Sequence, residues 1–515
     1  MQENRTKRTE AAERAALAQD PYTAFAAQRR KAMRQDPFYP VYHFTAPEGI
    51  MNDPNGLCFW KGRWHLFYQA FPPEKDIHWG HAVSEDLIHW EDLPYALAPE
   101  QDKGCWSGAA FVEENRVIAM YHGHEYGNIV AVSEDPLLLH WEKVGLLPIE
   151  TDGSYAVFDP CIWKEDDGFY YALSGSASPQ VEGGRNVRTE YLFRSADLRD
   201  WEYLHPLVKG DFDCIPGEDG ACPYFWPIGD KHILLHYSHH SGGKYLIGRY
   251  DREAHRLLGL NGGSFNTPWI NSSQLGGVHA PSAAPDGRGG LVTVFNLVEA
   301  FDGSSCRQIV SLPRRMTLCG PQGDELASAP APELSCIRGD HLHREHIAIP
   351  KNQEVVLPGV RGNVMELQLE FAAAESFPTL EIGVLRSEGA EEVTRIRCYR
   401  HRGLRNWDYF NECGGWDGRP YDTVVMLDNT DSSLLPGVTC RAPELGSFFL
   451  RAEETLRLQI FLDRGVIEVF VNDRLCLSSR VYPGREDSLG VSVRARECGT
   501  ELLRLDAWKY DGSTF

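Results

Sequence analysis

A short phrase that occurs three times in the first half of the chain is the feature that most constrains its fold. Ser84–Glu91 reads Ser-Glu-Asp-Leu-Ile-His-Trp-Glu, Ser195–Glu202 nearly repeats it, and Ser133–Glu142 has the same phrase with two extra residues. The copies begin at residues 84, 133 and 195, hence 49 and 62 residues apart. Repeats of about 50 residues with several short strands each are typical of propeller blades. We expect each copy to form a turn whose Trp packs between neighbouring sheets.

The rest of the chain favours β structure in two different arrangements. From about residue 40, runs rich in Tyr, Phe, Trp and Val alternate with Gly, Pro, Asp and Asn, as in short antiparallel strands. Pro and Gly cluster over residues 311–345, which indicates a domain boundary. Beyond it, Leu456–Asp463 and Val466–Val471 flank a turn at Arg464-Gly465, the pattern of a hairpin in an antiparallel sandwich.

The first 36 residues differ from the remainder because they are rich in Ala and other helix formers. The predicted organisation is therefore a helical N-terminal extension over 1–36, a β-propeller over 37–335 and a β-sandwich over 336–515. The fold class is all-β apart from the extension.

Composition excludes several classes of function. Of the 515 residues, 51 are Lys or Arg and 73 are Asp or Glu, a net charge of −22 that repels nucleic acid and anionic membranes. No apolar run is long enough to span a membrane. The 13 cysteines are scattered without CxxC or zinc-finger spacing, and the charged N-terminus lacks the apolar core of a secretion signal. We expect reduced thiols, no metal site and a cytoplasmic location.

Three acidic positions beside Pro or Gly could carry chemistry. Asp53 lies in Asn52-Asp-Pro-Asn-Gly, Asp159 precedes Pro160, and Glu218-Asp219 precedes Gly220. Each of these positions, taken alone, is explained by an ordinary turn. The three lie in different predicted blades, whose innermost strands converge on one axial pocket. Two carboxyl groups across a sugar ring are what glycoside hydrolysis requires, so together they favour a glycosidase site.

The chain from about residue 40 to the end resembles glycoside hydrolase family 32, which includes invertases, levanases, inulinases and sucrose-6-phosphate hydrolases. The resemblance depends on seven ordered motifs, which are Ile50–Gly56, Leu66–Gln69, His78–His81, Cys105–Gly108, Ser311–Arg314, Ile460–Arg464 and Glu468–Asn472. It implies a five-bladed propeller followed by a sandwich, and a retaining enzyme that needs no metal or other cofactor. In some relatives the sandwich contributes to dimer contacts, so a homo-oligomer is compatible with it.

The resemblance also implies residue roles. Asp53 would be the nucleophile that forms a covalent fructosyl-enzyme, and Asp159 would bind fructose hydroxyls and stabilise the transition state. The fructose subsite would be lined by Asn52, Gln69, Trp79, Trp106 and Ser107.

Three positions depart from the family pattern. Ile50 replaces a Trp, Phe158 replaces an Arg that binds sugar, and Ala221 replaces the acid/base Glu of a Glu-Cys-Pro motif. A branch of the family has a similar Glu-Asp-x-Ser-Cys-Pro pattern, which favours a relocated acid over a dead enzyme. Glu218 is the predicted acid/base and Asp219 its closest rival.

The predicted function is the release of fructose from sucrose or short β-fructo-oligosaccharides. Alternatives are transfructosylation, a propeller glycosidase of another specificity such as one active on arabinan, and a catalytically silent fructan-binding protein. The missing Arg and the displaced Glu favour the silent binding protein, whereas the retention of Asp53 and Asp159 argues against it.

Overall fold

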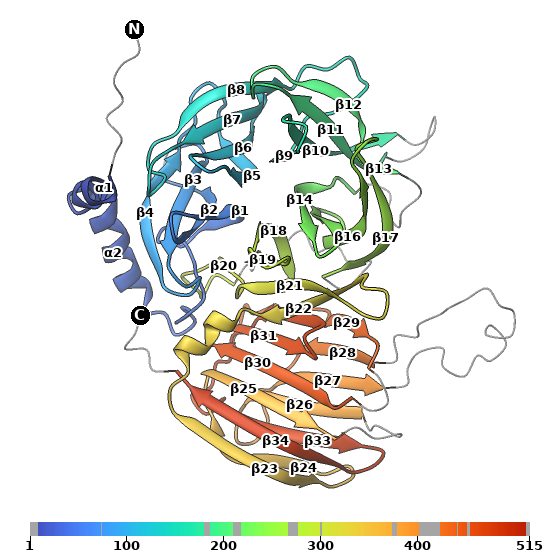
Figure 1. The fold of residues 1–515 in the computed structure, drawn as a ribbon. Helices are drawn as coiled ribbons and strands as arrows, with labels where there is room; N and C mark the ends of the chain where they lie inside the picture. The colour runs from blue at the N-terminus through green and yellow to red at the C-terminus, as the bar shows by residue number, and fades with distance from the viewer. Residues whose placement is uncertain are drawn as a thin grey trace, which may run out of the picture.

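The computed structural model describes residues 9–73, 75–179, 186–209, 218–265, 277–298, 301–372, 379–400, 423–439, 441–450 and 454–510. Five antiparallel sheets surround a central axis, and two larger sheets stack face to face beside the fifth (Figure 1). The predicted fold class, a five-bladed propeller followed by a sandwich with a helical extension, is confirmed.

Each blade takes its strands consecutively from the chain. Blade I contains β1 (Met51–Trp60), β2 (Arg63–Ala70), β3 (His78–Ser84) and β4 (Trp90–Leu97), and blade II contains β5 (Cys105–Val112), β6 (Val117–Gly123), β7 (Gly127–Ser133) and β8 (Glu142–Pro148). Blade III contains β9 (Pro160–Lys164), β10 (Tyr170–Pro179), β11 (Asn186–Ser195) and β12 (Glu202–Pro206). Blade IV contains β14 (Ala221–Ile228), β15 (Lys231–Ser238), β16 (Gly242–Asp251) and β17 (Arg256–Ser264), with β13 (Val208–Lys209) parallel to β17. Blade V contains β18 (Val278–Pro285), β19 (Leu291–Val298), β21 (Arg314–Cys319) and β22 (Glu325–Pro330), and β20 (Gln308–Val310) also pairs with β19.

The repeated phrase is the connection between the third and fourth strands of blades I, II and III. One Leu in each copy, Leu87, Leu138 and Leu198, has a positive φ of 68°, 52° and 71° respectively. That conformation costs a non-glycine residue about 1–2 kcal/mol, so the surrounding contacts impose the turn. The ring of Trp141 in blade II meets Phe67 of blade I edge to face at 5.7 Å between centroids. The expected packing between neighbouring sheets is thus confirmed for this Trp.

The sandwich stacks two six-stranded sheets over an apolar core. One sheet holds, in spatial order, β23 (His341–Ile349), β34 (Thr500–Lys509), β25 (Val364–Phe371), β30 (Leu456–Asp463), β31 (Val466–Val471) and β32 (Leu475–Arg480). The other holds β24 (Glu354–Arg361), β33 (Gly490–Arg496), β26 (Thr379–Arg386), β27 (Thr394–Arg400), β28 (Thr423–Asp428) and β29 (Glu444–Phe448). The predicted hairpin is β30–β31, with Asp463 paired to Val466 at its turn.

The N-terminal extension forms α1 (Glu10–Leu17) and α2 (Pro21–Met33), which lie along the outer strand of blade I (Figure 1). Thr9 and Asp20 cap the two helices by accepting backbone N–H groups. Arg30 of α2 pairs with Asp92 of β4, which fastens the extension to the propeller.

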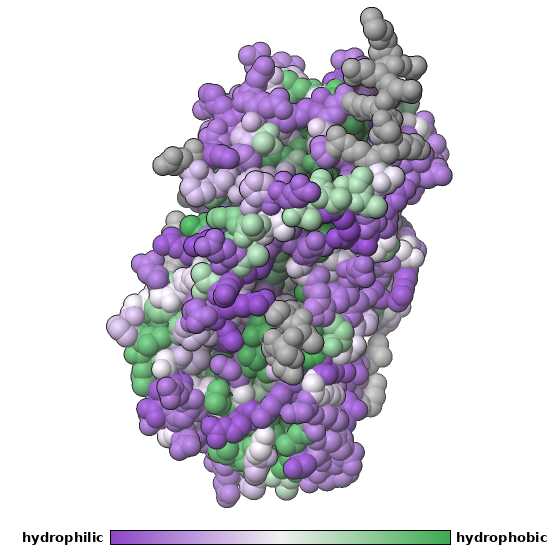
Figure 2. Space-filling view, turned by 90° about the vertical axis from the view of Figure 1, so that its left-hand side faces the viewer, coloured by the Kyte–Doolittle hydropathy of each residue, from purple (hydrophilic) through white to green (hydrophobic). Residues whose placement is uncertain are grey.

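On the side of the molecule that is on the left in Figure 1, hydrophilic and hydrophobic residues are interspersed over the surface (Figure 2). No helix in the described part of the chain is long and apolar enough to cross a membrane.

A buried polar network joins the propeller to the sandwich. Glu468 of β31 accepts hydrogen bonds from Arg314 of β21 at 3.0 Å and from the backbone N–H of Leu312 at 2.6 Å. Asp463 lies 2.8 Å from Nδ1 of His43, just ahead of blade I. Because every carboxylate and cation here has a partner, the two domains are held in one arrangement. The 3₁₀ helix η1 (Pro332–Ile337) lies between β22 and β23 and spans the predicted boundary at 335/336.

Candidate active site

Irregularities in the innermost strands position the candidate site. The strand pairing shifts near the start of four of these strands, between Met51 and Pro54, Cys105 and Gly108, Ala221 and Tyr224, and Val278 and Pro281. The shifts flank Asn52-Asp53, Trp106-Ser107 and Cys222-Pro223, and such bulges turn side chains out of regular alternation. Asp159 comes directly before β9, the innermost strand of blade III. Residues that are up to 244 positions apart in sequence therefore meet at the axis.

Asp53 lies at the centre of a hydrogen-bonded chain of side chains. Its Oδ2 accepts a hydrogen bond from Ser107 Oγ at 2.5 Å and one from Gln69 Nε2 at 3.2 Å. Gln69 in turn accepts a hydrogen bond from Asn52 Nδ2 at 3.1 Å, and Asn52 accepts one from Asn296 Nδ2 at 3.0 Å. These hydrogen bonds bring together four of the residues predicted from sequence, and those to Asp53 all involve its Oδ2.

Asp159 faces Asp53 across Cys222. The Cys222 thiol lies 3.6 Å from Asp53 Oδ2 and 3.5 Å from Asp159 Oδ2. The backbone N–H of Cys222 also donates to Asp159 Oδ2 at 3.0 Å. Cys222 reaches this position with a positive φ of 49°, a strained conformation for a residue with a side chain. The thiol thus connects the two carboxyl groups predicted to act on the sugar.

Burial controls the protonation of both carboxyl groups. Desolvation raises the pKa of Asp53, although the hydrogen bond from Ser107 offsets part of this rise. For Asp159, burial together with the negative charge of Asp53 raises the pKa from 3.8 to about 7. Asp159 is therefore partly protonated near neutral pH. Burial also holds the pKa of the Cys222 thiol well above its usual value, so it is a neutral contact.

The two predicted tryptophans occupy different layers. Trp106 is half-buried, and its ring lies 5.6 Å from that of His124. Trp79 is fully buried and stacks on Phe67 at 5.5 Å. Its indole N–H donates to the Trp106 carbonyl at 2.7 Å. Trp79 therefore supports the strand that carries Trp106 and Ser107, and its direct contact with a sugar stays a prediction.

Glu218 and Asp219 point to different partners. Glu218 is fully buried, with Oε1 2.5 Å from Lys244 Nζ and 2.6 Å from Ser241 Oγ. Asp219 is partly exposed, and its Oδ2 lies 2.5 Å from Nδ1 of His239. The structure does not place the two neighbouring carboxyl groups in equivalent positions.

Sequence reasoning did not single out Asn296, Cys222 or His239 as site residues. Cys222 lies on β14, the innermost strand of blade IV, and Asn296 lies on β19, the second strand of blade V. Only the position of Cys222, one residue after the altered acid/base position, gave any signal in the sequence. Of the departures from the family pattern, Ile50 is 43% exposed and Phe158 packs beside Cys222.

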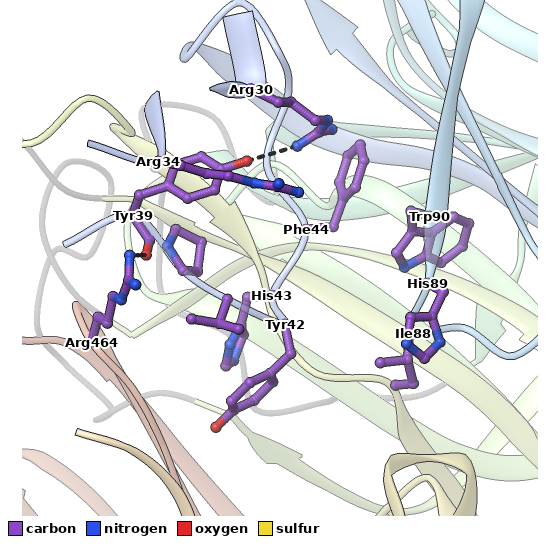
Figure 3. A pocket seen from close by; sticks show the side chains of 12 residues that line it. Arg30, Arg34, Tyr39, Tyr42, His43, Phe44, Ile88, His89, Trp90 and Arg464 are labelled. Carbon is purple, nitrogen blue, oxygen red and sulfur yellow. Dashed lines mark hydrogen bonds between the residues drawn. The ribbon is translucent and has the colours of Figure 1, made fainter. Parts of the chain in front are cut away.

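A separate cavity of about 380 Å³ lies at the junction of α2, blade I and the sandwich (Figure 3). Its lining includes Arg30, Arg34, Tyr39, Phe44, Trp90 and Arg464. None of the predicted site residues lines this cavity, and the carboxyl pair at the propeller axis remains the candidate for chemistry.

Two family models cover nearly the whole described architecture. The glycosyl hydrolases family 32 N-terminal domain matches residues 43–330, and the family 32 C-terminal domain matches residues 333–509. The chain belongs to glycoside hydrolase family 32. It is a glycoside hydrolase of the β-fructofuranosidase type.

Relatives in family 32 differ in the substrates that their names give. A sucrose-6-phosphate hydrolase of Escherichia coli is 29% identical over 494 residues, covering 88% of this chain and 91% of that protein. A levanase of Bacillus subtilis is 26% identical and covers 94% of this chain and 72% of its own length. The solved structure of fructan 1-exohydrolase IIa from Cichorium intybus has a TM-score of 0.77 at 20% identity, over 92% of this chain and 98% of that chain.

Proposed function

We propose that the protein releases fructose from sucrose or short β-fructo-oligosaccharides with retention of configuration. The supporting observation is the Asp53–Asp159 pair bridged by Cys222, with Ser107 and Gln69 donating to Asp53. Such a pair offers one carboxylate to attack the sugar, which is the nucleophile that a retaining mechanism requires, and one carboxyl group to bind sugar hydroxyls.

In the proposed first step, Asp53 attacks the anomeric carbon of the fructosyl unit while a general acid protonates the glycosidic oxygen and the bond to the leaving sugar breaks. Hydrogen bonds from Ser107 and Gln69 favour the ionised form of Asp53, which burial otherwise disfavours. Asp159 binds fructose hydroxyls and stabilises the positive charge that develops on the ring. In the second step, water gives a proton to the group that acted as the acid and attacks the same carbon, and the ester to Asp53 breaks.

The experiment is to incubate the protein with sucrose, 1-kestose and a levan oligosaccharide and to measure fructose release by ion chromatography. We expect release from at least one of them, and Asp53→Asn should reduce kcat by at least about 10³-fold with the fold intact. The matched control, Asp200→Asn, changes an exposed residue between β11 and β12 and should keep full activity. No release at high enzyme concentration and long times would refute hydrolysis and favour the silent binder.

Two further comparisons refine the substrate. Equal amounts of glucose and fructose from concentrated sucrose indicate hydrolysis, whereas a deficit of fructose with new trisaccharides indicates transfructosylation. The net charge of −22 offers no general support for a phosphorylated substrate, so we propose a higher kcat/KM for sucrose than for sucrose-6-phosphate. The reverse preference would contradict this part of the proposal. The cytoplasmic location stays a prediction.

A further inference from the structure

The residue that protonates the leaving sugar is the open question of this site, because Ala221 stands at the position of the family glutamate. Glu218 is the nearest glutamate in the described chain before β14, but its Oε1 accepts from both Lys244 and Ser241. Two donors therefore occupy Oε1 of this fully buried side chain, and its Oε2 is buried without a hydrogen-bond partner among the described residues. These contacts suit a structural ion pair inside blade IV.

Asp219 and His239 form a second pair at the end of the same hairpin. In the β14–β15 ladder, Ala221 is opposite Tyr237. Positions 219 and 239 are the next pair outward on the same side of this register. The contacts agree, since Asp219 accepts from the backbone N–H of His239 at 3.3 Å and lies 2.5 Å from its Nδ1. One carboxylate therefore bonds both the backbone N–H and the imidazole of His239.

A series of packed side chains connects this pair to the carboxyl groups at the axis. The His239 ring meets Tyr237 edge to face at 5.3 Å. Tyr237 packs in one cluster with Cys222 and Phe158, and Cys222 contacts both Asp53 and Asp159. The His239 side chain is 55% exposed, so its Nε2 can be reached by a ligand.

The geometry points to His239 as the proton donor to the leaving sugar, with Asp219 as the residue that positions it. This inference rests on the proposed fructoside hydrolysis. As the bond from the anomeric carbon to the glycosidic oxygen breaks, Nε2–H of the imidazolium gives its proton to that oxygen, and the ester to Asp53 forms. In the second step, Nε2 takes a proton from the water that attacks the anomeric carbon, and the ester breaks. Asp219 stays bonded to Nδ1 throughout.

The surrounding charges suit this role. The hydrogen bond to Asp219, followed by the charges of Asp159 and Asp53, raises the pKa of His239 above 6.5. The imidazolium form is thus favoured near neutral pH, where a general acid must hold its proton. The same positive charge offsets part of the rise in the pKa of Asp53 and of Asp159, which favours the nucleophilic carboxylate.

The test compares two substrates that differ in their need for an acid. Sucrose has a poor leaving group, whereas 4-nitrophenyl β-fructofuranoside releases a stable phenolate. We expect His239→Gln to lose at least about 100-fold in kcat/KM on sucrose and less than about tenfold on the nitrophenyl substrate. His240→Gln, which alters the exposed neighbouring His, is the matched control and should keep both activities.

A pH profile tests the positioning role of Asp219. Asp219→Asn removes the main interaction that raises the pKa of His239, so the alkaline limb of kcat/KM on sucrose should move to lower pH. Loss of fold alone would lower the rate without moving that limb.

Three outcomes would overturn the inference. If Glu218→Gln shows the selective loss on sucrose and His239→Gln does not, Glu218 is the donor. If His239→Gln loses both substrates equally while remaining folded by circular dichroism, the residue does not act on the leaving group. If the wild-type protein cleaves neither substrate, the proposed function itself fails, and this result is distinct from the first two.

Discussion

The raised pKa of Asp159 predicts how the free energy of unfolding changes with pH. Its pKa rises from 3.8 to about 7 on folding, so the folded protein keeps this proton at pH values where the unfolded chain has released it. Stability is therefore lost as pH rises through this window, and the total is about 3 pKa units at about 1.4 kcal/mol each, or about 4 kcal/mol. Between pH 5 and pH 8 the loss is about 2–3 kcal/mol, because part of it has already occurred at pH 5.

Asp159→Asn removes this dependence. The amide is neutral at every pH and keeps an oxygen that can accept the Cys222 N–H. Relative to wild type, the variant should therefore gain about 2–3 kcal/mol in the free energy of unfolding between pH 5 and pH 8. Asp200→Asn, at an exposed position, should show no such gain.

Urea unfolding followed by tryptophan fluorescence measures this change. All tryptophans except Trp407, Trp416 and Trp508 precede residue 311, so the signal reports mainly on the propeller. A gain that is absent, or that has the opposite sign, would show that Asp159 does not hold a proton at pH 5. Burial and the charge of Asp53 would then not control the protonation of this carboxyl group.

The remaining predictions concern three other contacts. Ser107→Ala removes a donor that lowers the pKa of Asp53, so the acidic limb of kcat/KM should move up by about one pH unit in a fructose-release assay; an unmoved limb would contradict this role. Glu468→Gln leaves a buried guanidinium without its carboxylate and should destabilise the protein by about 3–5 kcal/mol in urea at pH 7. Because the pKa of Glu468 is lowered from 4.5 to about 2, its stabilisation should be present above about pH 4.5 and lost as pH falls toward 2. Gly175→Ala would place a Cβ 1.9 Å from the Gly220 carbonyl oxygen, so kcat on sucrose should fall at least tenfold as the chain ahead of β14 is displaced; full activity would refute this contact.

Much of the fold could be predicted because its signals are local. The hairpin β30–β31 follows from alternation around a two-residue turn, and the repeated phrase marks the outer connection of three blades. The helices of the extension follow from composition and capping. The candidate site could be predicted in part, since Asp53 and Asp159 stand in recognisable motifs.

The directions of the side chains were decided by the tertiary structure. Trp79 belongs to a motif of the site, yet its indole N–H donates a hydrogen bond to the backbone carbonyl of Trp106. Glu218 and Asp219 are adjacent in sequence, but one pairs with Lys244 and the other with His239. Bulges and left-handed residues such as Cys222 break the period-two alternation of strands, so sequence spacing no longer tells which way a side chain points.

The sequence by itself determined that the chain forms blades, a sandwich and a pair of acidic motifs, because these depend on short-range periodicity and turn chemistry. Only the tertiary structure decided which groups share the axis and which protons they hold. Burial and charges from other blades set the protonation of Asp53 and Asp159, and those neighbours are distant along the chain.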